Sequence, residues 1–301
     1  MVPADVFAEW LRRQGATVLR TPSSYWYESV RRVYQAFPYH WLIDPDKREI
    51  SDLFAGGALA IRYSTPIDNH IGTPSYHVVY EQSEYDIAAL SSKARGHVRK
   101  GLSIAKVEPI SFERLANEGW ELRWDTLVRQ GRQRAESEHW WKRLCLSAAG
   151  LPRFEAWGAI AADGKLAAAL LAFAYDDYFS ILYQQSRTEY MRFGVNNALT
   201  HVVTADVLNR AHPLHLFYGL HSLDAPASVD EFKFQMRYVA KPIRQTVEFN
   251  PWLRPFVNPA SHMALKIGHR LLPGSPVIAK TEGMFRVHLE GRLHPSGQAT
   301  S

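Results

Sequence analysis

Residues 154–185 decide the fold, and they read FEAWGAIAADGKLAAALLAFAYDDYFSILYQQ. Asp163-Gly164 and Asp176-Asp177 divide this stretch, and an Asp-Gly pair between two apolar runs is a strong signal for a hairpin. The apolar runs have the length of core strands rather than helices. The segment therefore predicts three antiparallel strands: Phe154–Ala161, Leu166–Ala174 and Phe179–Gln185.

The residues after this meander predict a crossover to a fourth, parallel strand. Gly194 opens a long helical pattern that runs to about Arg210 and stops before Pro213. A charge-free strand follows, as expected at a buried sheet centre, and the long connecting helix makes a right-handed crossover the default. Pro242 in the last strand places that strand near a sheet edge. The elements expected here are a strand at Leu214–Leu220, a helix at Ser228–Met236 and a strand at Val239–Phe249. The order of elements gives an α/β fold with a mixed sheet.

The residues before the meander predict helices and two further strands. Ser24–Ala36 carries aromatic and aliphatic residues at helical spacing and is expected to be a helix. The other elements expected are helices at Ala4–Arg13, Asp86–Leu102, Phe112–Gln130 and Glu138–Ala149, and strands at Gly56–Tyr63 and Tyr76–Tyr80. We expect an N-terminal part at 1–110, a main domain at 111–250 and a Pro-rich tail with two helical patches at 251–301.

Composition sets the class of protein. Of the 301 residues, 46% are hydrophobic and nine are Trp, which is enough apolar material for a sizeable core. The single cysteine, Cys145, excludes an intramolecular disulfide. No apolar run approaches the roughly 20 residues of a membrane span, and the N-terminus lacks a signal-peptide core, so a cytoplasmic protein is expected. The net charge of +5 suits an anionic partner such as coenzyme A, tRNA or a lipid headgroup.

Five segments in a fixed order carry a resemblance to a known family. They are SSKARGHVRKGL, WDTLVRQGRQR with HWWKRL, the meander, GVNNALTHVVTADVLNRA, and FYGLHSLDAPASVDEFKFQMRY. From about Trp120 to Ile243 they resemble the FemAB-like branch of the GNAT acyltransferase superfamily. That branch includes the acetyltransferase domain of cellulose-biosynthesis accessory proteins. The part from Gly219 to Lys233 is the most specific.

The resemblance implies a GNAT-like mixed central sheet flanked by helices, and an N-acyltransferase that moves an acyl group from acyl-CoA to an amine. FemAB-like enzymes use aminoacyl-tRNA instead and contain two GNAT units. An aminoacyl-tRNA-dependent transferase therefore stays open, as does a degenerate first GNAT unit in the N-terminal part. A non-catalytic member that binds an anion is the third alternative. The partners implied are an amine-bearing small molecule, a peptide or a cell-envelope precursor, with tRNA as a further partner.

The donor-binding loop is expected at the start of the long helix. Free N–H groups at a helix N-terminus can hold a pyrophosphate. Arg192, Gly194, Val195 and Asn196 lie at such a turn, where glycine permits close approach of the backbone and arginine adds charge. GNAT enzymes carry Gln/Arg-x-x-Gly-x-Gly/Ala at this loop, whereas the sequence here, MRFGVN, has one glycine and no arginine or glutamine at the first position. The plain alternative is a strand-to-helix turn that needs glycine for its geometry.

Two residues are candidates for the chemistry of acyl transfer. In the family, a lysine at the position matching Lys233 lies close to the acyl-transfer centre, where a cation stabilises the developing oxyanion. The alternative for Lys233 is a surface ion pair with Asp230 or Glu231. His221 directly follows the charge-free strand and could accept the proton of the amine, although a structural histidine is the alternative.

Five more residues are candidates for substrate binding. Tyr183, Gln184 and Gln185 end the third strand of the meander, where polar side chains either contact substrate or meet solvent. Arg95 and Arg99 are four residues apart on the basic helix and could clamp a phosphate together, unless they form a solvated face. The scattered histidines show no metal-ligand spacing, so no metal is expected.

Overall fold

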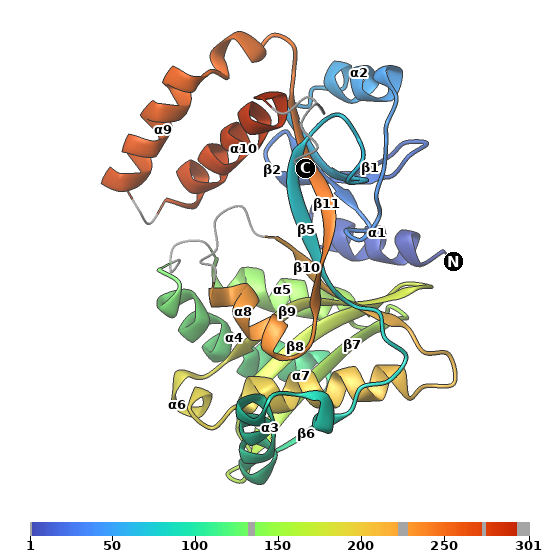
Figure 1. Ribbon diagram of the computed structural model, residues 1–301, viewed down its shortest axis with the longest axis vertical. Helices are drawn as coiled ribbons and strands as arrows, with labels where there is room; N and C mark the ends of the chain where they lie inside the picture. Colours follow the sequence, from blue (N-terminus) through green and yellow to red (C-terminus); the bar gives the residue numbers. More distant parts are fainter. Residues whose placement is uncertain (1, 132–135, 222–227, 273–274, 294–301) are drawn as a thin grey trace, which may run out of the picture. The chain divides into compact units, whose positions relative to one another are not determined.

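The computed structural model describes residues 2–131, 136–221, 228–272 and 275–293 (Figure 1). The chain forms two compact units. Unit 1 comprises Met1–Trp10, Val78–Gly219 and Pro226–Val239, and unit 2 comprises Leu11–His77, Leu220–Ala225 and Ala240–Ser301. The domain boundaries expected at residues 110 and 250 stay a prediction, because a compact unit of the structure need not coincide with an evolutionary domain.

Unit 1 is a mixed sheet covered by helices on both faces. Its strands lie in the order β10-β9-β8-β7-β6, with β9 and β10 parallel and the other pairs antiparallel. Its elements are α1 (Pro3–Arg13), η1 (Ile87–Ala89), α3 (Ser92–Ile104), β6 (Ala105–Pro109), α4 (Phe112–Arg129), α5 (Glu138–Ala148), β7 (Phe154–Ala161), β8 (Leu166–Ala174), β9 (Tyr178–Ser186), α6 (Thr188–Met191), α7 (Val195–Leu208), β10 (His215–Leu220) and α8 (Ser228–Gln235). The predicted meander and the parallel crossover are confirmed.

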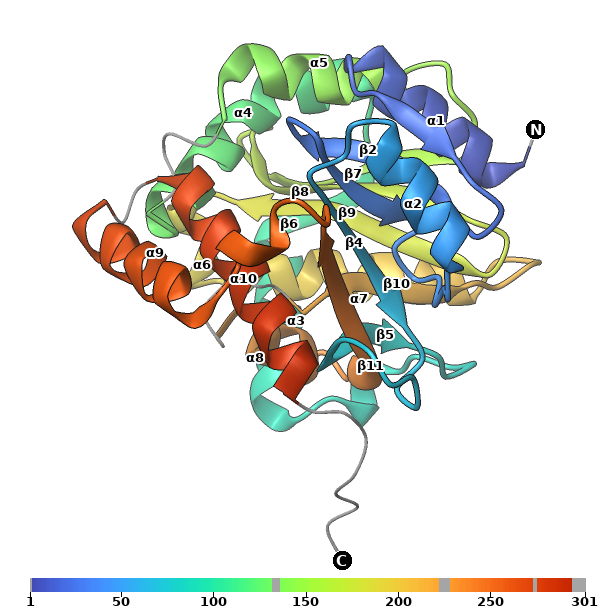
Figure 2. The ribbon, with the colours of Figure 1, turned by 90° about the horizontal axis from the view of Figure 1, so that it is seen from above.

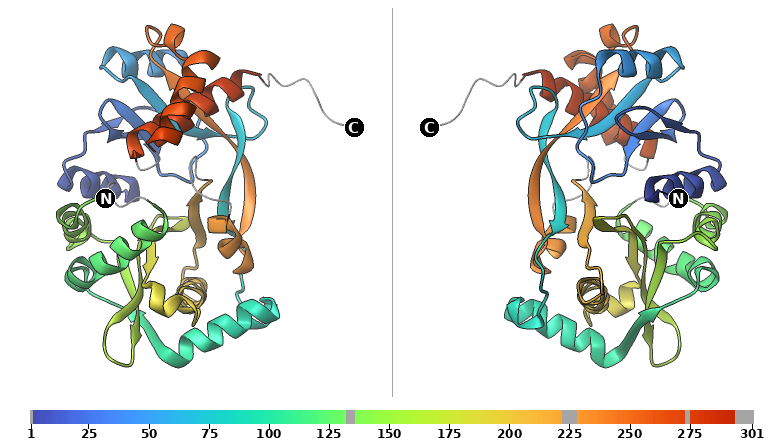
Figure 3. Two further views of the ribbon diagram at one scale, coloured as in Figure 1. Left: turned by 90° about the vertical axis from the view of Figure 1, so that its left-hand side faces the viewer. Right: turned by 90° about the vertical axis from the view of Figure 1, so that its right-hand side faces the viewer.

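The core of unit 1 lies around β8, whose residues from Leu166 to Phe173 are fully buried. Helices α4 and α5 lie on one side of this sheet and α7 on the other (Figure 3). At the end of the sheet where the meander begins, Phe7 of α1 packs edge-on against Phe173 at 5.2 Å between ring centroids. Each face of the meander is therefore covered, which explains why its strands read as unbroken apolar runs.

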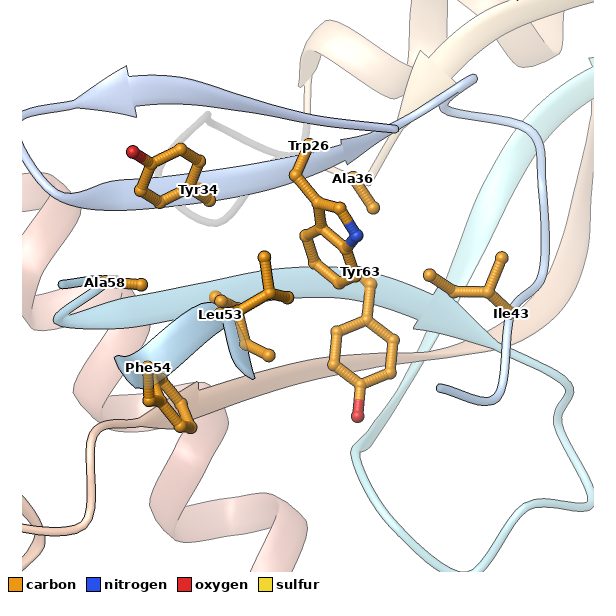
Figure 4. Packing of buried hydrophobic residues seen from close by; sticks show 9 residues of the cluster. Trp26, Tyr34, Ala36, Ile43, Leu53, Phe54, Ala58 and Tyr63 are labelled. Carbon is orange, nitrogen blue, oxygen red and sulfur yellow. The ribbon is translucent and has the colours of Figure 1, made fainter. Parts of the chain in front are cut away.

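Unit 2 is built around strands in the order β1-β2-β3-β4-β11-β5, in which β3 and β4 are parallel. Its core packs Trp26 edge-on against Tyr63, in a cluster that includes Leu53 and Phe54 (Figure 4). A second cluster packs Phe285 against Phe249 at 5.2 Å. The elements are β1 (Val18–Arg20), β2 (Tyr25–Val30), β3 (Val33–Phe37), α2 (Lys47–Ala55), β4 (Ala60–Thr65), β5 (Thr73–Tyr80), β11 (Val239–Phe249), η2 (Arg254–Phe256), α9 (Pro259–Leu271) and α10 (Pro276–Leu293).

Two sequence expectations about unit 2 are wrong. The segment Ser24–Ala36 is not a helix but the hairpin β2–β3, which turns at Arg32 with a positive φ of 59°. Its aromatic and β-branched residues favour a pleated surface, and this preference outweighs the helical spacing. Strand β11 is not at an edge, because it lies between β4 and β5. Pro242 is tolerated there because the pairing with β4 begins only at Arg244.

Candidate acyl-transfer site

The candidate site in unit 1 lies where two parallel strands pass beyond their pairing. Strands β9 and β10 pair only where Tyr178–Ser180 lies beside His215–Phe217. Strand β9 also contains a bulge, because Leu171 lies opposite Tyr183 while Ala172 lies opposite Ile181, so Leu182 is an extra residue. A bulge leaves its extra residue out of the ladder and bends the strand. Past Ser180 and Phe217, the backbones of the described residues of β9 and β10 therefore do not pair with each other.

A hydrogen-bond network joins β9, β10 and α7 beyond this point. The Tyr218 hydroxyl donates to Gln184 Oε1, and Gln184 Nε2 donates to Thr200 Oγ1 at 3.1 Å. Asn196 Nδ2 donates to Ser186 Oγ at 2.9 Å and extends the network to the first turn of α7. The network fixes the predicted residues Gln184 and Asn196 in one place.

Lys233 lies beside the same tyrosine. Its side chain is only 10% exposed, Nζ is 2.8 Å from Asp230 Oδ1, and Nζ lies 5.1 Å from the centre of the Tyr218 ring. The ion pair proposed as an alternative from the sequence therefore exists, but it is buried rather than on the surface. A buried ion pair fixes the position of the ammonium group next to Tyr218.

Burial keeps the aromatic hydroxyl groups of this region neutral. Tyr218 packs edge-on against Tyr238 at 5.2 Å, and Tyr238 shares a 2.7 Å hydrogen bond with Thr204. Burial raises the pKa of Tyr218 and of Tyr238, because the phenolate would lose its hydration. At neutral pH the two hydroxyls carry no charge, and the Tyr218 hydroxyl donates to Gln184.

The N-terminus of α7 bears positive charge, but its glycine also serves packing. Gly194 has a φ of 75°, and no side chain caps the helix there. Arg192 and Lys100 lie over the Phe193 ring at 4.7 and 5.0 Å. A Cβ on Gly194 would lie 2.8 Å from the carbonyl carbon of His97, so the glycine lets α3 approach α7. The geometric alternative for Gly194 therefore holds, alongside a basic rim that can attract an anion.

Two of the other candidates, Tyr183 and Arg95, contact protein groups. Tyr183 lies between Trp141, edge-on at 5.9 Å, and the Arg123 guanidinium at 5.4 Å. Arg95 donates to the backbone oxygens of Ala88 and Leu90 at 2.9 and 3.1 Å, so its guanidinium holds η1 in place. Arg99 is exposed. A joint phosphate clamp by Arg95 and Arg99 stays a prediction.

Gln185 differs sharply from its neighbour Gln184. It is 1% exposed, and neither its amide nitrogen nor its amide oxygen has a hydrogen-bond partner among the residues that the structure describes. An unsatisfied buried amide costs free energy. Gln185 therefore either serves a ligand or weakens the fold.

His221 belongs to unit 2, where it lines a pocket of about 300 Å³. Its ring stacks on Tyr76 at 4.5 Å, and its backbone oxygen accepts a hydrogen bond from Gln245 Nε2 at 3.0 Å. Arg62 donates to Gln245 Oε1 at 2.6 Å. The residues that line the pocket are Tyr27, Ser29, Val30, Val33, Gln35, Arg62, Leu220, His221, Lys280 and Met284. These described lining residues include two cations and no carboxylate, so the pocket favours an anion. The loop expected to follow His221 falls on residues 222–227, which lie outside the described residues.

Several residues of these two sites were missed in the sequence, although some left a signal. Thr200 is one helical turn after Asn196, a spacing that places both on one face of α7. Arg62 is a charged residue inside the apolar strand AIRYST, which is an unusual place for a guanidinium. Tyr218 and Lys280 left no comparable signal, because their neighbours come from distant parts of the chain. No cluster of three or more metal-ligating side chains occurs in the described part of the chain.

Comparison with known proteins agrees with the fold described above. No protein-family model and no curated protein matches the chain. FemX matches 83% of this chain over 92% of its own, with a TM-score of 0.56 and 10% identity. L-PGS from Bacillus licheniformis matches 83% over 92%, with a TM-score of 0.50 and 12% identity. The C-terminal domain of a protein assigned as a lysylphosphatidylglycerol synthetase from Agrobacterium fabrum matches 82% over 88%, with a TM-score of 0.51 and 13% identity.

These similarities define the class of fold. The chain has the fold of FemX, and the FemAB-like resemblance found in the sequence is confirmed at the level of the fold. The similarity to FemX covers most of both chains. At 10–13% identity the similarity extends to the fold alone.

Proposed function

We propose that this protein is an N-acyltransferase that moves an acyl group from a thioester donor such as acyl-CoA to an amine. One observation carries the proposal: Tyr218, Gln184 and Lys233 come together where β9 and β10 pass beyond their pairing. This arrangement offers a neutral hydroxyl donor, a fixed ammonium group and strand backbone groups around one point. Acyl transfer needs such donors, aimed at the charge that develops in the transition state.

The donor would lie between the end of β9 and the start of α7. The first N–H groups of α7 are not capped by a side chain, and Arg192 and Lys100 stand beside them. These groups support binding of a pyrophosphate. Asn196, which the network holds, lies in the same first turn.

The chemistry follows from the groups near Tyr218. The amine nitrogen attacks the thioester carbonyl carbon, so that a C–N bond forms and the oxygen becomes an oxyanion, which the Lys233 ammonium stabilises. The intermediate collapses, the C–S bond breaks and a thiolate leaves. Tyr218 gives its proton to the thiolate and regains one from the amine. Burial raises the pKa of Tyr218, so its hydroxyl stays protonated at neutral pH and a proton is present when the thiolate forms.

We infer that the pocket of unit 2 recognises an anionic group of a substrate. Arg62, Lys280 and His221 line it together with Val30, Val33 and Met284. The carboxylate or phosphate of a substituted amine would bind the cationic side chains, and its apolar part would contact the apolar side chains. A cell-envelope precursor, a peptide or a small amino compound has this chemistry.

Aminoacyl-tRNA is the alternative donor. The exposed residues Lys93, Arg99 and Lys100 on α3 favour it, because a strip of cations can follow a nucleic-acid backbone. A member that only binds an anion is the remaining alternative.

The test is binding of acetyl-CoA and of aminoacyl-tRNA by calorimetry, together with thiol release over a panel of amines. We expect acetyl-CoA to bind and Arg192→Ala to weaken it about fivefold, as loss of one charge near a phosphate should. Lys106→Ala is the control, since Lys106 is an exposed lysine of β6 paired with Glu108 at 2.5 Å. Binding of aminoacyl-tRNA without binding of acetyl-CoA would favour aminoacyl-tRNA as the donor. Binding of neither would contradict both enzymatic proposals.

A further inference from the structure

Helix α9 carries an exposed apolar stripe that the function proposed above does not use. Met263, Ile267 and Leu271 follow one another at intervals of four residues and are 57%, 50% and 76% exposed. Residues four apart lie on one face of a helix. Further large apolar side chains are exposed in the same part of unit 2, namely Trp252, Phe256, Leu272 and Val277.

The opposite face of α9 is already occupied. In the first turn, Asn258 and Ser261 form a capping box. His262 Nε2 lies 2.8 Å from Glu282 Oε1 of α10, and the Gly268 backbone approaches Ile278. Helix α10 in turn packs on the strands through Phe285 and Val287, and it lies between α9 and β11 (Figure 1, Figure 2). The helix is therefore fixed in place with its apolar stripe turned away from unit 2.

The charged residues of the segment that carries the stripe are of one sign. No aspartate or glutamate occurs in the sequence between Glu248 and Glu282, whereas Arg254, Lys266, Arg270 and Lys280 do. Lys266 and Arg270 are exposed on α9 itself, in the same turns as Ile267 and Leu271. An apolar stripe flanked by cations is the pattern of a helix that lies in the plane of a membrane surface. No described helix of the chain is both long and apolar enough to cross a bilayer.

We propose that the outer face of α9 docks on an anionic lipid surface, with Met263, Ile267 and Leu271 entering the headgroup region and Lys266 and Arg270 contacting phosphates. A nucleic acid would satisfy the cations but would leave the apolar stripe in water. A second copy of this chain would cover the stripe but would bring like charges together around it. An anionic bilayer satisfies both features. The proposal is independent of the proposed function, because it concerns a different face and needs no turnover.

The experiment is co-sedimentation of the full chain with phosphatidylcholine vesicles that contain or lack phosphatidylglycerol. We expect binding to the anionic vesicles only, weakened by salt. Ile267→Asp should lower it at least tenfold. Lys266→Glu with Arg270→Glu should also lower it, although this pair leaves the apolar stripe intact. Val128→Asp is the matched control, since Val128 is 43% exposed on helix α4 of unit 1, and it should bind like the wild type.

Three outcomes would overturn the proposal. The first is equal binding to both kinds of vesicle, or none to either. The second is a dimer in sedimentation velocity that Ile267→Asp dissociates, which would assign the stripe to a second copy. The third is retention of an RNA oligonucleotide but not of vesicles. Thermal melting of each variant shows whether it is folded. If Ile267→Asp does not fold, the variant with Lys266→Glu and Arg270→Glu still tests the proposal.

Discussion

The polar groups around Tyr218 in unit 1 bind one another, whereas those around Arg62 in unit 2 surround an open pocket. In unit 1, Gln184 links Tyr218 to Thr200, and Lys233 is paired with Asp230. In unit 2, Gln245 holds Arg62, yet about 300 Å³ stays open beside it. The first region is organised before any ligand arrives, as a catalytic centre requires, and the second offers charge to a ligand.

The largest effect is expected where the scaffold of the first region is most crowded. Gly194→Ala should destabilise the protein by about 3 kcal/mol or more, because a left-handed alanine is strained and its Cβ would press on His97 of α3. Gly131→Ala is the control, with a φ of 68° but nothing within 4 Å of the added Cβ, and should cost about 1 kcal/mol. Urea denaturation measures both. Equal losses would mean that α3 does not need the close approach.

The next effect tests whether the ion pair of unit 1 is catalytic. Lys233→Ala should lower turnover at least tenfold, which corresponds to about 1.4 kcal/mol of transition-state stabilisation. The reason is that the variant removes the only cation described next to Tyr218 within unit 1. Lys142→Ala is the control, because Lys142 also pairs with a carboxylate at 2.8 Å on a helix but is 41% exposed. Thiol release measures turnover, and an unchanged rate in a folded Lys233→Ala variant would remove this lysine from the mechanism.

The pocket of unit 2 should respond differently. Arg62→Gln should raise the KM for amines that carry a carboxylate or a phosphate about tenfold, because a charge-assisted hydrogen bond of roughly 1.5–3 kcal/mol is lost. The KM for the donor and the KM for uncharged amines should not change. Arg31→Gln, at an exposed arginine of the β2–β3 turn, is the control. Equal changes in KM for charged and uncharged amines would show that the pocket does not recognise the anionic group of the acceptor.

The comparison also explains what the sequence could predict. The meander and the crossover were predictable because their signals are local: apolar runs, an Asp-Gly turn and a long helix that ends before a proline. The hairpin β2–β3 was not, since aromatic residues at helical spacing also suit a strand. Lys233 was predictable as a candidate through the family resemblance, and Gln184 through its place at the end of the third strand of the meander. Their partner Tyr218 and the pocket residues Arg62 and Lys280 were not, because long-range packing alone brings them to their sites.

The smallest effect is expected at Gln185, in contrast to its neighbour Gln184 on β9. Gln184→Met should cost about 1–2 kcal/mol, because it removes the acceptor of the Tyr218 hydroxyl and the donor to Thr200. Gln185→Met should be neutral or stabilising by up to about 1 kcal/mol, since the buried amide of Gln185 has no hydrogen-bond partner among the described residues. Denaturation of both variants, with calorimetry of acetyl-CoA binding, measures the difference. A loss of donor affinity in Gln185→Met without a loss of stability would show that the unsatisfied amide serves the ligand, and the site of unit 1 would then extend to the second face of β9.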